Sequence, residues 1–192
     1  MADTQALPQE IIAKFVGAAH GDFATVQTML TEEPALLNAR FEEWNECALE
    51  AASHMGQREI AEFLLAQGAP LTICAASMLG RSEDVTRFLT EEPALANSAG
   101  AHGIPVLFHA AMSGNTRIAN ALLKHGGGQG MSAALHGATR FGYTEMVRWL
   151  LAHGAEPNPQ DYQGKTPLAV ALELGHETLA ALLREHEGVE SV

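Results

Sequence analysis

Residues 164–176 read Gly-Lys-Thr-Pro-Leu-Ala-Val-Ala-Leu-Glu-Leu-Gly-His, and the pattern of this stretch recurs along the chain. Its alanine- and leucine-rich part favours a helix of about two turns. Gly175 is expected to end that helix, because a glycine adopts the left-handed C′ conformation without the steric cost of a Cβ atom. The stretch therefore predicts a short helix closed by a glycine.

The same ending occurs five times earlier in the chain. The closing glycines are Gly21, Gly56, Gly80, Gly114, Gly142 and Gly175, separated by 35, 24, 34, 28 and 33 residues. Each glycine is followed by a segment with apolar residues at helical spacing, such as Met146, Val147 and Leu150. Residues 31–38 also recur almost unchanged as residues 90–97. The sequence thus predicts six helix pairs that share one core.

Residues 164–176 resemble the ankyrin repeat pattern Gly-x-Thr-Pro-Leu-His-x-Ala-Ala-x-x-Gly-His, and residues 49–56, 107–114 and 135–142 follow the same frame. The resemblance covers about residues 8–186. It implies an all-α ankyrin-repeat helical solenoid with short β-turn fingers, and a module that binds a protein or peptide through its concave groove and fingers. We expect one domain over residues 1–192, with units at about 8–40, 41–68, 69–98, 99–127, 128–158 and 159–187.

Two of the glycine-to-glycine steps are shorter than the usual period of about 33 residues. The missing residues lie at 67–72 and 126–131, between the second helix of one unit and the first helix of the next. We therefore expect two fingers to be shortened or missing, with full fingers only before units two, four and six. Unit one lacks the Thr-Pro-Leu signature and is expected to cap the array.

Composition and charge restrict the partners. The 192 residues carry a net charge of −12, which repels phosphate backbones and anionic lipids. We expect no nucleic acid and no membrane as partner, and favour a protein or peptide with a basic or apolar segment. The chain has only two cysteines, Cys47 and Cys74, and shows no signal peptide and no apolar run of membrane-spanning length. These features predict a cytoplasmic protein.

The residues that could carry chemistry have structural explanations. None of the nine histidines shows the His-x-x-x-His spacing of a zinc site, and no Cys-x-x-Cys is present. The glycine-rich residues 126–130 are interpreted as a connector and not as a phosphate loop. Cys74 is expected in the core, and the neighbours Glu46 and Glu50 should oppose ionisation of Cys47. We expect no metal, no cofactor and no catalytic residue, although a metal site assembled across repeats stays open.

The resemblance implies that the two residues before each closing glycine face the concave groove. At those positions Met55, Met78, Leu79, Met112 and Phe141 form an apolar stripe, which we call the groove stripe. Flexible, polarisable methionines are typical of adaptable binding surfaces, so the stripe is predicted to be an exposed contact surface. The alternative is that shortened fingers or tight curvature bury it.

Two further observations complete the predicted binding residues. Trp44 lies among acidic residues in the finger before unit two, where it is either an exposed anchor for a basic partner or packed on its own finger. The alternative function is a small-molecule-binding protein or atypical enzyme that uses His54, His109 and Arg140 around the groove stripe. The predicted partner-binding residues are therefore Trp44, His54, Met55, Met78, Leu79, His109, Met112, Arg140 and Phe141.

Overall fold

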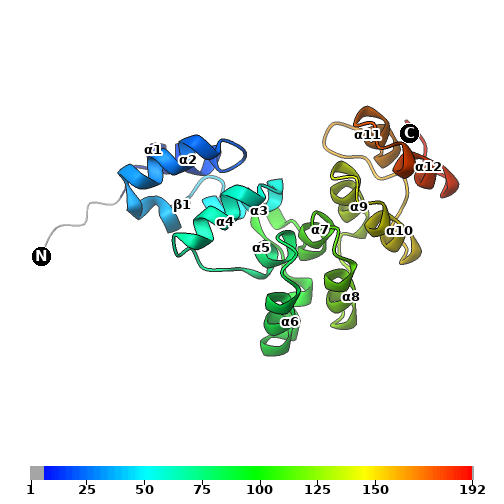
Figure 1. Cartoon of the computed structure of the whole chain (residues 1–192), viewed down its shortest axis with the longest axis horizontal. Coiled ribbons are helices and arrows are strands. Elements are labelled where there is room, and N and C mark those ends of the chain that lie inside the picture. The colour runs from blue at the N-terminus through cyan, green and yellow to red at the C-terminus, as the bar shows by residue number, and fades with distance from the viewer. Residues whose placement is uncertain (1–6, 192) are drawn as a thin grey trace, which may run out of the picture.

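The computed structural model describes residues 7–191, which form six pairs of α-helices arranged along an arc (Figure 1). The first helices of the pairs are α1 (Gln9–Ala18), α3 (Ala48–Met55), α5 (Ile73–Met78), α7 (Val106–Ala111), α9 (Met131–Arg140) and α11 (Pro167–Glu173). The second helices are α2 (Phe23–Glu32), α4 (Arg58–Ala66), α6 (Ser82–Glu91), α8 (Thr116–Lys124), α10 (Thr144–Ala152) and α12 (Glu177–Glu185). The predicted all-α solenoid is confirmed.

The first helices form one continuous row, in which each packs on the next from α1 through α11. The second helices lie outside this row, and α6 and α8 point away from the hollow of the arc (Figure 1). Among residues 7–191, no helix is long and apolar enough to cross a membrane.

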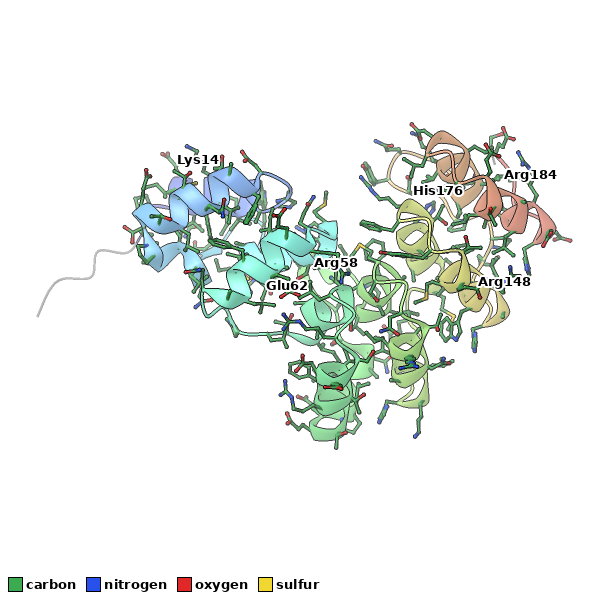
Figure 2. All side chains as sticks on the ribbon, in the orientation of Figure 1. Lys14, Arg58, Glu62, Arg148, His176 and Arg184 are labelled. Atoms are coloured by element: carbon green, nitrogen blue, oxygen red, sulfur yellow. The ribbon has the colours of Figure 1, made fainter. Side chains whose placement is uncertain are left out.

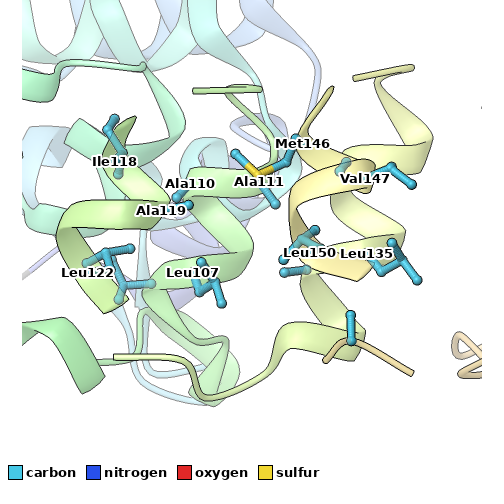
Figure 3. Packing of buried hydrophobic residues seen from close by; sticks show 14 of the residues in the cluster. Leu107, Ala110, Ala111, Ile118, Ala119, Leu122, Leu135, Met146, Val147 and Leu150 are labelled. Carbon is cyan, nitrogen blue, oxygen red and sulfur yellow. The ribbon is translucent and has the colours of Figure 1, made fainter. Parts of the chain in front are cut away.

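Leucines at the interfaces between successive pairs build the core. Figure 3 shows Leu107 of α7, Leu122 of α8, Leu135 of α9 and Leu150 of α10 packed together, and all four are at most 2% exposed. Each such side chain contributes about 1.5–3 kcal/mol through its removal from water. Alanines between these leucines let the helices approach closely. The apolar residues that recur at helical spacing in the sequence therefore form the interface between successive pairs.

Fingers are present where the chain has room for them. Before unit two, β1 (Arg40–Phe41) pairs with β2 (Glu46–Cys47) in antiparallel register. Before unit four, Ala99 and Pro105 form a single antiparallel bridge around the 3-10 helix η3 (Ala101–Gly103). Before unit six, the backbone N–H of Asp161 donates to the carbonyl oxygen of Lys165 at 3.0 Å. The short connections before units three and five form no strand.

The repeated Thr-Glu-Glu-Pro segments fold alike. Each places a 3-10 helix after a second helix, η1 (Pro34–Asn38) after α2 and η2 (Pro93–Asn97) after α6. The likeness of residues 31–38 and 90–97 therefore marks equivalent positions in units one and three.

Five of the six closing glycines have the predicted left-handed backbone, with φ between 68° and 75°. Gly21 does not, and the prediction is wrong there. Helix α1 ends at Ala18, and the amides of Gly21 and Asp22 both donate to its carbonyl oxygen, at 3.0 and 2.7 Å. Asp22 then accepts from the amide of Thr25 and starts α2 directly. Unit one therefore turns without a left-handed residue.

Candidate functional site in the concave groove and at the fingers

The groove stripe is largely core, so the prediction of an exposed contact surface is wrong for three of its five residues. Met78, Leu79 and Met112 are 0%, 6% and 4% exposed. Helix α5 is a six-residue helix held between α3 and α7, and the missing finger before it lets its neighbours close in. Tight packing of the inner row therefore buries these side chains. A polar replacement such as Met78→Gln would bury an unpaired amide and destabilise the fold.

A charged side chain closes the buried end of α5. Arg58, labelled in Figure 2, lies at the start of α4. Its two terminal nitrogens donate to the carbonyl oxygens of Met78 and Leu79, each at 2.7 Å. These carbonyls end a helix and lack intrahelical partners. The guanidinium satisfies both at once, so the stripe residues of α5 are anchored through their backbone as well as their side chains.

The remaining stripe residues border a real pocket. A cavity of about 150 Å³ lies in the concave groove, and its wall includes His54 and Met55 of unit two together with Arg140 and Phe141 of unit five. Five predicted binding residues therefore meet at one place, because buried Met112 also lines the pocket. The sequence did not single out Phe108, His136, Gly137, Asp161, Tyr162 and Val170, which complete the wall.

Steep curvature brings unit two against unit five. A Cβ atom on Gly56 would collide with the ring of Phe141, although the two residues are three units apart. Phe141 in turn stacks on Tyr143, with ring centroids 6.1 Å apart. The pocket therefore depends on contacts between distant units. The repeat pattern in the sequence does not show which distant units come into contact.

The rim of the pocket is polar. Tyr162, at the tip of the finger before unit six, is 87% exposed. Burial raises the pKa of the Asp161 carboxyl, but hydrogen bonds from the amides of Lys165 and Gln163 outweigh burial and hold it below its usual value. Burial lowers the pKa of His136, whose Nε2 lies 3.0 Å from the carbonyl oxygen of Pro159. The rim thus combines an ionised carboxylate with an exposed aromatic ring.

His109 does not line the groove pocket. The three residues of the small-molecule alternative therefore do not form one site. His109 is 1% exposed and borders a different cavity of about 270 Å³ together with Cys74 and Gly100. Burial lowers the pKa of His109 to about 4, despite a contact of Nδ1 with the carbonyl oxygen of Pro105 at 3.1 Å. The groove therefore combines His54 with Arg140 but not with His109.

The two cysteines lie where the sequence analysis expects them. Cys74 is in the core, and burial raises the pKa of its thiol to about 12. Burial also raises the pKa of Cys47, which opens α3 as its N-cap, and Glu50 adds to that shift. Both are free thiols of low nucleophilicity.

Trp44 is both exposed and packed on its own finger, which are the two alternatives that the sequence left open. Its side chain is 41% exposed, yet its ring packs edge-on against Phe41 at 4.9 Å and His20 at 6.0 Å between centroids. The finger therefore leaves part of the indole open to solvent and packs the rest against Phe41 and His20.

Those residues form a cluster that the sequence analysis missed. Glu46 is fully buried, and the Nε2 atoms of three histidines converge on its carboxylate: His54 at 2.8 Å from Oε1, and His102 and His20 at 3.4 and 3.6 Å from Oε2. Burial raises the pKa of the Glu46 carboxyl, but the facing imidazoles of His54, His20 and His102 outweigh it and hold the pKa below its usual value. No spacing rule links positions 20, 46, 54 and 102, because four separate elements bring them together.

Comparison with known proteins agrees with this architecture. The family profile described as "Ankyrin repeats (3 copies)" matches residues 71–161 and 107–191. Cyclin-dependent kinase inhibitor 2A of Monodelphis domestica is 32% identical over 147 residues, which cover 72% of this chain and 81% of that protein. The Homo sapiens protein of the same name is 33% identical over 125 residues, 60% of this chain and 77% of the relative.

A third relative shares only a segment. Potassium channel AKT1 of Arabidopsis thaliana is 40% identical over 81 residues, which are 40% of this chain but 10% of the channel. The profile match, the alignment with a relative over most of its length, and the helix pairs closed by left-handed glycines point to one assignment. The chain belongs to the ankyrin repeat family.

Proposed function

We propose that the chain is a protein-interaction module that binds a peptide segment of its partner in the concave groove. The observation that carries the proposal is the apolar pocket between Met55 and Phe141, with exposed Tyr162 at its rim. Exposed aromatic residues beside an apolar pocket are typical anchors of protein interfaces. Trp44 on the finger before unit two is proposed as a second contact.

The size and charge of the site define the partner. A cavity of about 150 Å³ can hold a benzene ring, so the pocket suits one leucine or aromatic side chain. The neighbouring surface carries Asp161 and Glu173 together with Arg140 and Lys165, which pairs with Glu173, so the preference for a basic segment rests on the net charge of −12. We therefore propose a segment with one apolar side chain next to lysine or arginine residues.

The roles of the predicted residues divide accordingly. Met55, Arg140, Phe141 and His54 would touch the bound segment, whereas buried Met78, Leu79 and Met112 would support the groove. His109 borders a different cavity and would take no part. The relatives named as inhibitors of a kinase act on a protein, which supports a protein partner for this chain. Because Cys47 and Cys74 are free thiols, we propose that the chain works in the cytoplasm.

Selection from a random peptide library with the full chain as bait tests the proposal. We expect peptides that combine an apolar residue with adjacent basic residues, and affinities that fall as salt is added. Tyr162→Ala should weaken binding about tenfold or more, because the loss of an aromatic anchor typically costs about 1.4–2 kcal/mol or more. Fluorescence polarisation of a labelled selected peptide provides the dissociation constants.

A matched control is Ile11→Ala on α1. Ile11 is also a large exposed hydrophobic residue, at 41%, but it lies outside the groove. Its replacement should leave peptide affinity unchanged. Equal losses in both variants would place binding outside the groove, and a small molecule retained in native mass spectrometry without any selected peptide would favour the alternative function.

A further inference from the structure

The cluster beneath Trp44 has an unusual electrostatic arrangement. Glu46 is 0% exposed, and neither of its carboxylate oxygens has a partner in hydrogen-bonding geometry among residues 7–191. The Nε2 atom of His54 is likewise buried without such a partner, even though it lies 2.8 Å from Oε1. A buried carboxylate normally needs compensation, so something must balance its charge.

The tautomer of His20 shows which atom faces the carboxylate. Its Nδ1 lies 3.0 Å from the carbonyl oxygen of Val16, which can only accept, so Nδ1 carries the proton. In the neutral ring, Nε2 then turns a lone pair toward Oε2 of Glu46 at 3.6 Å. Two electron-rich atoms that face each other favour a cation between them or a second proton on the ring. Donation from the other ring nitrogen to a backbone carbonyl is typical of metal-binding histidines.

Protonating all three rings is an unfavourable way to compensate one carboxylate. The ring centroids of His20 and His54 are 5.1 Å apart, and those of His54 and His102 are 5.2 Å apart. Three imidazolium ions would therefore repel one another at short range around a single negative charge. Neutral imidazoles that share one divalent cation with the carboxylate avoid this repulsion.

Three of the ligand atoms lie close enough together to share such an ion, and His102 approaches the same carboxylate from the finger before unit four. Four ligands at about 2.0–2.2 Å in a tetrahedron lie about 3.3 Å from one another. The nitrogen–oxygen distances to Glu46 are 2.8, 3.4 and 3.6 Å, and the ligand atoms of His20, Glu46 and His54 all lie within 4.8 Å of one another. Imidazole nitrogen with one carboxylate oxygen is a donor set that zinc and related ions prefer.

We propose that His20, Glu46 and His54, completed by His102, bind one divalent transition-metal ion, with Zn²⁺ as the natural test case. The ion would join the end of α1, strand β2, the last turn of α3 and the finger before unit four. It would thereby tie units one, two and four together at their fingers.

The backbone around the site is consistent with this role. Asn45, directly before Glu46, and His102 are two of the three non-glycine residues with positive φ among residues 7–191, at 48° and 57°. Such conformations persist where surrounding structure enforces them, and they cluster at functional sites. Both lie in the two fingers that carry Glu46 and His102.

Zinc titration of the chelator-treated full chain, prepared without a polyhistidine tag, tests the proposal. In a Trp149→Phe background the fluorescence comes from Trp44 alone, whose ring lies 6.0 Å from that of His20. We expect a saturable change at one Zn²⁺ per chain, with a dissociation constant below about 1 µM as for built protein sites. Bound metal should also raise the midpoint of thermal unfolding, because the unfolded chain lacks the site.

Variants separate this site from surface histidines. Glu46→Gln and His54→Gln remove ligands with little change of shape, and each should weaken Zn²⁺ binding about tenfold to hundredfold or more. His20→Gln does the same at a partly exposed side chain, so it keeps the test valid if a buried variant fails to fold. The matched control is His125→Gln, because His125 also ends a helix with Nδ1 2.9 Å from a carbonyl oxygen four residues earlier. It should bind Zn²⁺ as the unmodified chain does.

Two results would overturn the proposal. The first is the absence of Zn²⁺ binding at about 10 µM metal, which would leave a cluster of protonated histidines around Glu46. The second is binding that the Glu46, His54 and His20 variants retain but His125→Gln reduces. The two proposed sites share His54, so variants outside the overlap separate them: Tyr162→Ala should leave Zn²⁺ affinity unchanged, and His20→Gln should leave peptide affinity unchanged.

Discussion

At Gly80 the backbone has φ of 75°, and an added Cβ atom would meet only Ser113, at an ordinary contact distance of 3.6 Å. A side chain there is therefore opposed by the backbone and not by crowding. Gly80→Val should lower the free energy of unfolding by about 1–3 kcal/mol, because β-branched residues strongly disfavour positive φ. Urea unfolding followed by circular dichroism measures the change.

The control for this prediction is Gly17→Ala. Gly17 lies inside α1 without positive φ, and no atom lies within 4 Å of its added Cβ. That variant should gain up to about 1 kcal/mol through helix propensity. If both variants lost stability equally, the left-handed conformation of Gly80 would not be the cause.

His109 gives a prediction on pH. Burial lowers its pKa from an ordinary 6.5 to about 4, so between these values the unfolded chain binds a proton that the folded chain does not. Stability therefore falls as the pH drops from about 6.5 toward 4, by about 3 kcal/mol in total from this one group. His109→Gln, which does not titrate, should flatten this part of the stability profile measured by urea unfolding. A slope equal to that of the unmodified chain would contradict a buried neutral imidazole.

At the scale of elements, α5 depends on a side chain from its neighbour. Arg58→Ala removes both donors to the carbonyls of Met78 and Leu79 and should lower the free energy of unfolding by about 1–2 kcal/mol. Arg148→Ala on α10 is the control, because among residues 7–191 Arg148 makes only an exposed contact with Glu145 at 3.7 Å. Its loss should cost less than about 0.5 kcal/mol. Similar losses in chemical denaturation would show that Arg58 does not cap α5.

The elements themselves could be predicted because their signals are local. The apolar period and the closing glycines lie within single units, so the helix pairs and the three fingers follow from short segments. The burial of Met78 and Met112 could not be predicted, since it depends on the curvature that accumulates over several units. The convergence on Glu46 is even less visible, because it needs two fingers from different units to meet.

At the scale of the whole molecule, α5 joins two halves of the core. Ile73, Cys74 and Ala76 pack with the C-terminal units, whereas Ala75 and Met78 pack with the N-terminal units. The same short helix therefore belongs to both hydrophobic clusters. Repeat arrays unfold cooperatively where neighbouring interfaces are strong, so we expect the two halves to unfold together.

The two tryptophans allow this to be measured. Trp44 reports on unit two, and Trp149 reports on unit five, where its indole N–H donates to Asn120 at 3.1 Å. The single-tryptophan variants Trp44→Phe and Trp149→Phe should each show a fluorescence transition at the same urea concentration as its own circular dichroism transition. Separate midpoints for the two halves would mean that α5 does not couple them.

The missing finger before unit three has a consequence for modularity. Repeat proteins are commonly treated as interchangeable units, from which any one can be exchanged for a standard copy. Here the missing finger before unit three lets the finger before unit four lie beside the finger before unit two. His102 and Trp44, one from each finger, line the same cavity. A standard unit inserted at this position would restore a regular period and place a loop between those fingers. In this chain unit three, which no finger precedes, is therefore the unit that can least be exchanged.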